Sequence, residues 1–158
     1  MKIENRIIET LNCLEFEKET FVCVSNSIIR KANFNSCNLS FELKIENCII
    51  SNFLIHSCWF TEGLILKNNH ISNYVDYQMG GHNKKNIVID RNIFNEFVNF
   101  FDCQFESPLE VTNNIFHKGT NLLGNVDEGY KNIFNTPIVI WNNIGDLAVC
   151  GVGETKGF

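Results

Sequence analysis

Charged side chains recur along this sequence at nearly regular intervals, and such groups can carry acid–base chemistry when a fold brings them together. Lys67 follows Glu46 by 21 residues, and Asp90 follows Lys67 by 23. A positioned carboxylate or amine can accept or donate a proton in a reaction. The candidate catalytic residues are Glu46, Lys67, Asp90, Arg91 and Glu110. The simpler interpretation is a solvated face of alternating charge, because one Asp among basic residues lacks the paired carboxylates of glycoside hydrolysis.

Aromatic side chains supply a second set of candidates, this time for binding. Trp59 and Trp141 fall at positions expected to point outward, and tryptophan is enriched at interface hot spots. Packing beneath neighbouring loops is the alternative. Residues 74–86, which include two tyrosines, two glycines and two lysines, form a further candidate contact segment. The candidate binding residues are Trp59, Trp141, Tyr74, Tyr77, His82, Lys84 and Lys85.

Several kinds of reactive site are missing from the sequence. There is no nucleophile elbow, phosphate-binding loop, HExxH motif or dinucleotide fingerprint. The seven cysteines include no CxxC pair, and an odd count without a secretion signal favours reduced, buried thiols. The four histidines fall at different repeat positions, which disfavours a metal cluster, although His82 could be an isolated surface ligand. The sequence therefore favours a non-enzymatic protein and predicts no cofactor and no metal site.

The chain of 158 residues has 20% charged and 44% hydrophobic residues, which suits a single domain with a buried core. Its net charge of −5 argues against direct nucleic-acid binding. No apolar stretch has the length of a membrane span, and none follows the N-terminal charges as in a secretory signal, so we expect a cytoplasmic protein. The 24 Asn and 19 Ile residues, against two Ala, favour strands and turns over helices.

A short pattern recurs through the chain and organises these residues. It reads apolar, any residue, mostly Asn, a small polar residue and two mostly apolar residues, and successive copies start 21, 21, 21, 23, 22 and 29 residues apart. The copies begin at Ile3, Val24, Ile45, Leu66, Ile89, Val111 and Ile140. A second pattern lies between them at residues 34–39, 55–60 and 100–105, and each copy has a central cysteine. Each repeat therefore holds at least two short strands.

A period near 21 residues is too short for two helices and fits a solenoid, in which each turn of chain pairs with the next through parallel strands. Equivalent residues then stack in columns. The expected buried columns are Val24, Ile45, Leu66, Ile89, Val111 and Ile140, and Ile29, Ile50, Ile71, Phe94 and Phe116. The fourth pattern position, which runs from Ser27 to Asn143, is expected at a corner. Asn tolerates a left-handed backbone there and can bond the same amide one coil away.

The apolar-x-Asn-Asn-x-Ile/Phe form of these repeats, as in residues 111–116, resembles the right-handed parallel β-helix of the pectate-lyase-like family. The resemblance covers residues 3 to about 145. It implies an all-β, right-handed parallel β-helix solenoid of about six coils of 21–23 residues. Members of that family use outward carboxylates and basic residues for catalysis or for Ca²⁺, which implies a possible role for the charged group around Asp90.

Two segments interrupt the repeat. Residues 74–86 and 119–137 are predicted to be inserted loops, the kind of segment that often carries function in a solenoid. Residues 1–145 then form a single β-helix domain, and residues 146–158 a C-terminal tail or cap. An open first coil would expose strand edges. The candidate covers are the C-terminal segment of a second copy, an end-to-end dimer, or residues 9–20 folded across the face, and we expect a homo-oligomer.

Two functions follow from these expectations. The first is a non-enzymatic intracellular protein that binds another protein, or itself, through a rigid acidic surface. A phage or mobile-element inhibitor of a host protein would be one such case, because opposite charge steers association. The alternative is a carbohydrate-binding or polysaccharide-degrading β-helix module, whose exposed Trp and Tyr residues would contact the glycan.

Overall fold

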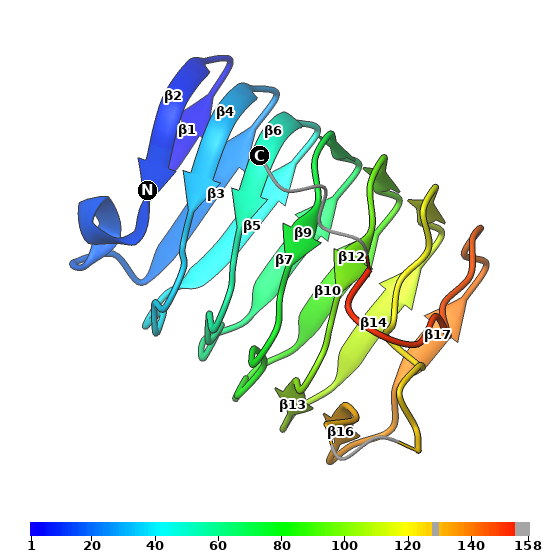
Figure 1. Cartoon of the computed structure of the whole chain (residues 1–158). Coiled ribbons are helices and arrows are strands. Elements are labelled where there is room, and N and C mark those ends of the chain that lie inside the picture. Colours follow the sequence, from blue (N-terminus) through cyan, green and yellow to red (C-terminus); the bar gives the residue numbers. More distant parts are fainter. Residues whose placement is uncertain (128–129, 154–158) are drawn as a thin grey trace.

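A computed structural model of the protein describes residues 1–127 and 130–153. Within this part of the chain, short parallel strands stack into a β-solenoid of about five turns with almost no helix (Figure 1). The all-β parallel solenoid predicted from the sequence is thus confirmed. Its turn count is close to the six expected, and the interval between the last two repeats is the irregular one.

The first strand of each repeat belongs to one long sheet. Among the described residues this sheet has seven strands in the order β1-β3-β5-β7-β10-β14-β17. Their bounds are β1 (Lys2–Glu4), β3 (Phe21–Ser25), β5 (Glu42–Glu46), β7 (Leu64–Lys67), β10 (Ile87–Asp90), β14 (Leu109–Thr112) and β17 (Val139–Trp141). The register pairs equivalent repeat positions, for example Ile45 with Leu66 and Leu66 with Ile89. One sequence repeat therefore forms one turn of the solenoid.

The second strand of each repeat belongs to a sheet of six strands in the described chain, in the order β15-β11-β8-β6-β4-β2. Their bounds are β2 (Ile7–Asn12), β4 (Ile28–Asn33), β6 (Ile49–Leu54), β8 (His70–Ile71), β11 (Ile93–Phe94) and β15 (Ile115–Phe116). Two short pairs complete the turns: β9 (Val75–Asp76) with β12 (Val98–Asn99), and β13 (Gln104–Phe105) with β16 (Ile133–Phe134). All of these pairs are parallel.

The predicted apolar columns fill the interior. Both columns are buried, apart from the half-buried Ile140 in the last described coil. Aromatic rings continue the stacking, since the Phe94 and Phe116 ring centroids lie 4.9 Å apart and their planes are parallel. Burial of such side chains stabilises the fold by about 2–3 kcal/mol each. The core thus runs along the solenoid axis as stacked layers.

At the corner between the two large sheets, the sequence predicts one pattern position that is both left-handed and part of an amide ladder. In the structure these two roles belong to two adjacent positions. The left-handed residue is the third pattern position, with φ between 49° and 57° at each copy. These residues are Asn5, Asn26, Asn47, Asn68, Arg91, Asn113 and Asn142. The fourth position, wrongly predicted to be left-handed, instead turns inward. Its side chains form the asparagine ladder, defined here as Asn69, Asn92, Asn114 and Asn143, in which each Nδ2 donates to the next Oδ1 over 3.0 Å.

Residues 74–86, expected to project as a loop, instead complete a regular turn. Val75 and Asp76 pair with Val98 and Asn99 in the next coil, and Gly81 bridges to neighbouring coils on both sides. The segment remains part of the solenoid because its alternate side chains face inward, as in the preceding coil. Glycines take the place of the cysteine that marks the second pattern in other coils.

Residues 119–137 also remain close to the wall where they are described. Thr120 bridges to Val98, β16 pairs with β13, and residues 128 and 129 lie outside the described residues. The described residues after Gly145 lie against the coils, since the Thr120 N–H donates to the Asp146 carbonyl over 2.8 Å. The Tyr74 hydroxyl donates to the Val152 carbonyl over 2.9 Å, and residues 154–158 lie outside the described residues.

Cys13 and Cys37 form a disulfide, with Cα atoms 6.8 Å apart, whereas the sequence analysis predicts reduced thiols throughout. The reason is local. The chain turns in the short 3-10 helix η1 (Cys13–Phe16), and Phe16 is buried with its ring centroid 5.8 Å from that of Phe41. This places residue 13 beside the next coil. Cys23, Cys48, Cys58 and Cys103 are buried, as expected, and Cys150 is exposed.

Candidate functional site

The charged candidates lie together on the outer face of the first sheet. The register sets Glu46 on β5 beside Lys67 on β7, and Lys67 beside Asp90 on β10. Lys67 Nζ lies 3.9 Å from Asp90 Oδ2, and Arg91 Nη2 lies 2.7 Å from the same oxygen. Glu46 pairs with Lys44 on its own strand at 2.9 Å. Glu110, on β14, is exposed. The predicted adjacency is therefore present.

Asp90 differs from its expected place on a solvated face, because only 5% of the residue is exposed. Its Oδ1 accepts hydrogen bonds of 2.9 Å from Thr112 Oγ1 and from Asn113 Nδ2. Burial raises the pKa of this carboxyl, but the hydrogen bonds from Asn113 and Thr112 and the Arg91 charge outweigh it, so that the pKa is lowered overall. An ionised carboxylate whose oxygens are already bonded fixes neighbouring strands rather than transferring protons.

A second corner of the solenoid has a more open surface. At this corner the left-handed residues are Ser36, Ser57, Met79 and Asp102, with φ between 51° and 58°. Each begins a short segment that pairs with the coils on either side, through bridges from Asn38 to Trp59, Trp59 to Gly81 and Gly81 to Gln104. Side chains of successive coils therefore form rows along this corner.

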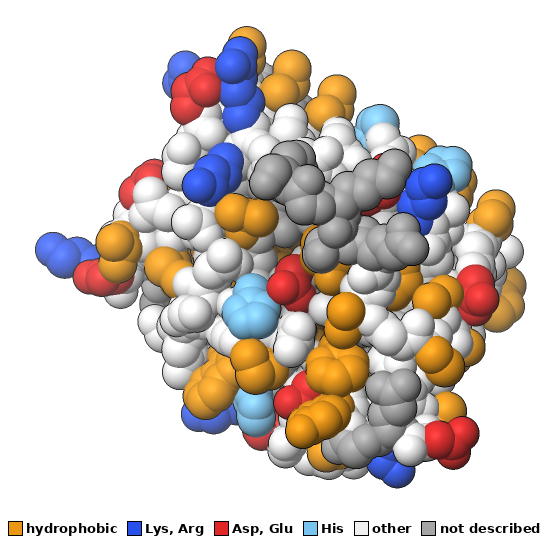
Figure 2. All heavy atoms as spheres, viewed as in Figure 1, with side chains coloured by type: hydrophobic (Ala, Val, Ile, Leu, Met, Phe, Trp, Pro, Cys, Tyr) orange, Lys and Arg blue, Asp and Glu red, His pale blue; other side chains and the backbone are white. Residues whose placement is uncertain are grey.

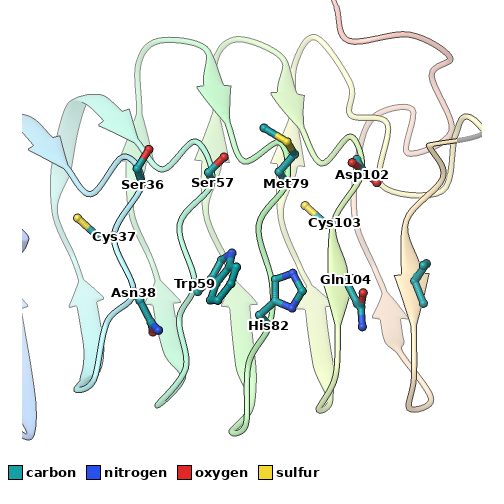
Figure 3. A pocket seen from close by; sticks show the side chains of 11 residues that line it. Ser36, Cys37, Asn38, Ser57, Trp59, Met79, His82, Asp102, Cys103 and Gln104 are labelled. Atoms are coloured by element: carbon teal, nitrogen blue, oxygen red, sulfur yellow. The ribbon is translucent and has the colours of Figure 1, made fainter.

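A groove of about 540 Å³ runs along these rows and is the candidate functional site. Figure 3 shows its two sides, one with Ser36, Ser57, Met79 and Asp102 and the other with Asn38, Trp59, His82 and Gln104. Its lining residues are Ser36, Cys37, Asn38, Ser57, Trp59, Met79, His82, Asp102, Cys103, Gln104 and Ile133. These come from five successive coils, so the groove suits an elongated ligand.

Gly81 allows two neighbouring coils to approach closely on one side of the groove. It occupies the position that Trp59 fills in the preceding coil and Gln104 in the following one. Its φ is +96°, and a Cβ placed there would lie 2.1 Å from the Gln104 carbonyl oxygen. Only glycine suits both the backbone and this close approach. In this coil His82, rather than residue 81, provides the side chain beside Trp59 (Figure 3).

Trp59 forms the principal apolar surface of the groove, with 41% of the residue exposed. Its ring centroid lies 4.5 Å from that of His82, with the planes tilted by 45°. His82 Nδ1 in turn lies 3.1 Å from Glu106 Oε1. This chain of contacts fixes the indole from one side while the other side faces solvent, as in a preorganised binding surface.

Cys103 lies at the base of the groove but is unsuited to nucleophilic chemistry. It is buried, and its Sγ donates to the Tyr77 carbonyl over 2.9 Å. Burial raises the pKa of this thiol. Since the thiolate is the reactive form of cysteine, the residue acts as a small core side chain. Cys103 therefore gives the groove no reactive thiol.

The remaining binding candidates lie elsewhere. Tyr77 is wrongly predicted to be a surface contact, because only 1% of it is exposed and its hydroxyl accepts the Gly81 N–H over 3.1 Å. Tyr74 is half-buried beneath the tail and stacks on Phe97 with centroids 6.3 Å apart. Trp141, 68% exposed, points outward from β17, as predicted, but is not a lining residue of the groove.

The two lysines of this segment lie on the surface. Lys84 is exposed, and Lys85 Nζ pairs with Glu62 Oε2 at 2.8 Å. Figure 2 shows acidic and basic side chains interspersed over one face of the molecule. On that face the net negative charge is therefore not gathered into one patch.

Sequence reasoning found Trp59 and His82 but missed Met79, Asp102 and Gln104 as their neighbours. The signal was present in the second pattern, whose third and fifth positions are Ser57 and Trp59 in one copy and Asp102 and Gln104 in another. The copy between them has glycines instead of cysteine, so the pattern does not align Met79 with Ser57 and Asp102. Register across three coils, rather than any local motif, brings these residues together.

Comparisons of the chain with protein-family models, curated proteins and solved structures gave no match. Within the described residues, no group of three or more His, Cys, Asp or Glu side chains is placed to hold a metal ion. No helix in that part of the chain is long and apolar enough to cross a membrane.

Proposed function

We propose that this protein is a non-enzymatic binding module that holds an extended segment of another protein in the groove beside Trp59. The observation that supports this most is the Trp59 indole, which is 41% exposed and packs against His82 in the lining of the groove. Tryptophan is among the residues most enriched at the hot spots of protein interfaces. The pectate-lyase-like relationship and the right-handed coil, supported by the Asn-rich repeats, belong to the same proposal.

The chemistry of the groove indicates what kind of segment it would accept. Trp59 and Met79 are both 41% exposed, and together they offer an aromatic face and an adaptable thioether to an apolar side chain. Asp102 lines the groove and is exposed, and Glu106 lies next to His82. The lining residues include no lysine or arginine. We therefore expect a segment with an apolar anchor and a basic residue.

The length of the groove sets the length of the segment. Asn38, Trp59, Gly81, Gln104 and Ile133 occupy successive coils. Four steps of roughly 4.8 Å span about 19 Å, which an extended chain covers with about six residues. A rigid solenoid loses little conformational entropy on binding such a segment.

Selection from a display library of random peptides on the immobilised protein tests this proposal. We expect enriched peptides to combine an aromatic or aliphatic residue with Lys or Arg. Their affinity should fall by about 30-fold for Trp59→Ala, the effect of losing a 2 kcal/mol hot spot. Trp141→Ala is the matched control and should leave the affinity unchanged. Equal loss with both variants, or no enrichment, would reject the groove as the peptide site.

A glycan is the second candidate ligand, because the carboxamides of Asn38 and Gln104 lie on the same side of the groove as the Trp59 ring (Figure 3). An aromatic face with amide donors and acceptors on its flanks suits a sugar ring and its hydroxyls. Glycan-array binding that is lost with Trp59→Ala but kept with Trp141→Ala would favour this ligand. Glycan binding that does not depend on Trp59 would show that the glycan does not bind in the groove.

A further inference from the structure

An outward row of isoleucines crosses the second sheet from one end of the solenoid to the other. Parallel pairing sets the first residue of each strand beside the next, from Ile7 to Ile115, and a bridge adds Ile144. The isoleucine row is defined here as Ile7, Ile28, Ile49, His70, Ile93, Ile115 and Ile144. Figure 2 shows hydrophobic side chains side by side along the upper edge, where β2, β4 and β6 begin in Figure 1.

The row is more apolar than a solvated strand face requires. In β4 and β6 the next residue, Ile29 or Ile50, is buried, so the row positions alternate toward solvent. Nevertheless Ile7, Ile49 and Ile144 are 69%, 48% and 65% exposed. A continuous exposed apolar surface marks an interaction site, whereas single exposed apolar residues do not.

The order of residues along the row points to a second copy of the same chain. Three isoleucines lie on each side of His70, which is therefore the central position of the seven. A two-fold interface presents the same surface from both copies and so requires a self-complementary pattern. Whether the two-fold axis runs along the row or across it, His70 meets the His70 of the second copy, and isoleucine meets isoleucine elsewhere.

The borders of the row also suit such an interface. On one side lie the left-handed corner residues, which are all asparagine except Arg91. On the other side Glu9 and Arg30 pair within the chain at 3.3 Å. An apolar centre with a polar rim is the usual composition of a protein interface.

The area available predicts a weak interface. Six steps of roughly 4.8 Å make the row about 29 Å long, and the bordering residues widen it to about 20 Å. Each copy would bury roughly 600 Å², which gives a total near the lower limit of about 1,200 Å² for specific complexes. A reversible dimer with a micromolar dissociation constant is the expected result.

We infer that two copies of this chain associate through the isoleucine row. This inference goes beyond the proposed function, because no residue of the row lines the groove. The dimer would carry two grooves on one rigid body. Partners with two copies of the bound segment would then gain avidity from simultaneous engagement.

Sedimentation equilibrium over a concentration series tests the inference on the full chain. The unaltered protein should dimerise with a micromolar dissociation constant, and Ile49→Asp should weaken the dimer at least about 100-fold by burying a charge in the interface. Unfolding midpoints show that the variant is folded, and Trp141→Ala, on the first sheet, should still dimerise. A monomer at every concentration, or a dimer indifferent to Ile49→Asp, would overturn the inference.

A charge-swap experiment tests the symmetry of the interface separately. His70→Glu and His70→Lys each place two like charges at the centre and should each be monomeric. An equimolar mixture of the two should recover a heterodimer, because Glu then meets Lys. Recovery would support the two-fold arrangement, whereas two dimeric single variants, or a monomeric mixture, would contradict it. Peptide binding in the groove should be unaffected in all of them, which keeps this test independent of the proposed function.

Discussion

Two corners of the solenoid use the same left-handed backbone but do different things with the residue that follows. At the corner between the large sheets that residue is Asn in four successive coils, and its amide is buried in the asparagine ladder. At the groove corner it is Cys37, Cys58, Gly80 or Cys103, and the side chain of the next residue differs from coil to coil. Repetition at the first corner holds the coils in register. Variation at the second creates a surface.

Under the proposed function, this difference separates stability from recognition. A ladder needs identical residues because each amide bonds its own copy one coil away. A binding groove needs different residues because its ligand is not periodic. The backbone is shared, so the groove corner can change its side chains without losing the turn.

Breaking the ladder should have the largest effect on stability. Asn92 Oδ1 accepts both the backbone N–H and Nδ2 of Asn69, each over 3.0 Å, and its own Nδ2 donates to the Leu66 carbonyl over 2.8 Å. Asn92→Ala leaves these buried groups unsatisfied and should lower the free energy of unfolding by about 3 kcal/mol. Urea denaturation measures this loss.

The neighbouring left-handed residue provides the control for that experiment. Asn68→Ala changes an exposed residue with φ of 54°, and should cost about 1 kcal/mol through backbone strain alone. Equal losses from Asn68→Ala and Asn92→Ala would mean that the ladder contributes nothing beyond the turn.

At the groove corner, Gly81→Ala should cost about 2 kcal/mol, less than the ladder variant. The added methyl group meets the Gln104 carbonyl oxygen, and the φ of +96° disfavours any side chain. The neighbouring coils can shift because this corner holds no ladder. Thermal and urea unfolding would show the loss, and a variant as stable as the wild type would contradict the close packing described here.

The smallest predicted effect is a pH dependence from Asp90. The folded-state pKa is lowered, so the ionised carboxylate stabilises the fold above the unfolded-state pKa of about 4. This contribution is lost as pH falls through the lower folded-state pKa. The stability difference between wild type and Asp90→Asn should therefore shrink below about pH 4. A stability difference that does not change with pH would show that the charge of the Asp90 carboxylate does not stabilise the fold.

The parts of the fold that repeat strictly could be predicted from the sequence. The columns at Ile45 and Ile50 follow from one apolar residue every turn, and the outward direction of Trp59 follows from its buried neighbours Cys58 and Phe60. The corner roles could not be separated, because adjacent pattern positions both contain Asn. Only the backbone shows that Asn68 turns the chain while Asn69 points inward.

The parts of the fold that depart from the repeat could not be predicted from the sequence in this way. Gly80 and Gly81 replace the residues that define the second pattern. The sequence therefore predicts an inserted loop for this coil and a surface position for Tyr77. In the structure Tyr77 fills the core, with its ring centroid 5.7 Å from that of Phe60. The Cys13–Cys37 bond was missed because it depends on a local turn outside the repeat.

A titration of the isotopically labelled protein with a selected peptide distinguishes binding at the groove corner from binding at the ladder corner. Amide chemical shifts would be followed in nuclear magnetic resonance spectra. The account predicts the largest shifts at Trp59, His82 and Gln104, with Asn92 and Asn114 unchanged. Largest shifts at the asparagine ladder, at Trp141 or along the isoleucine row would contradict it.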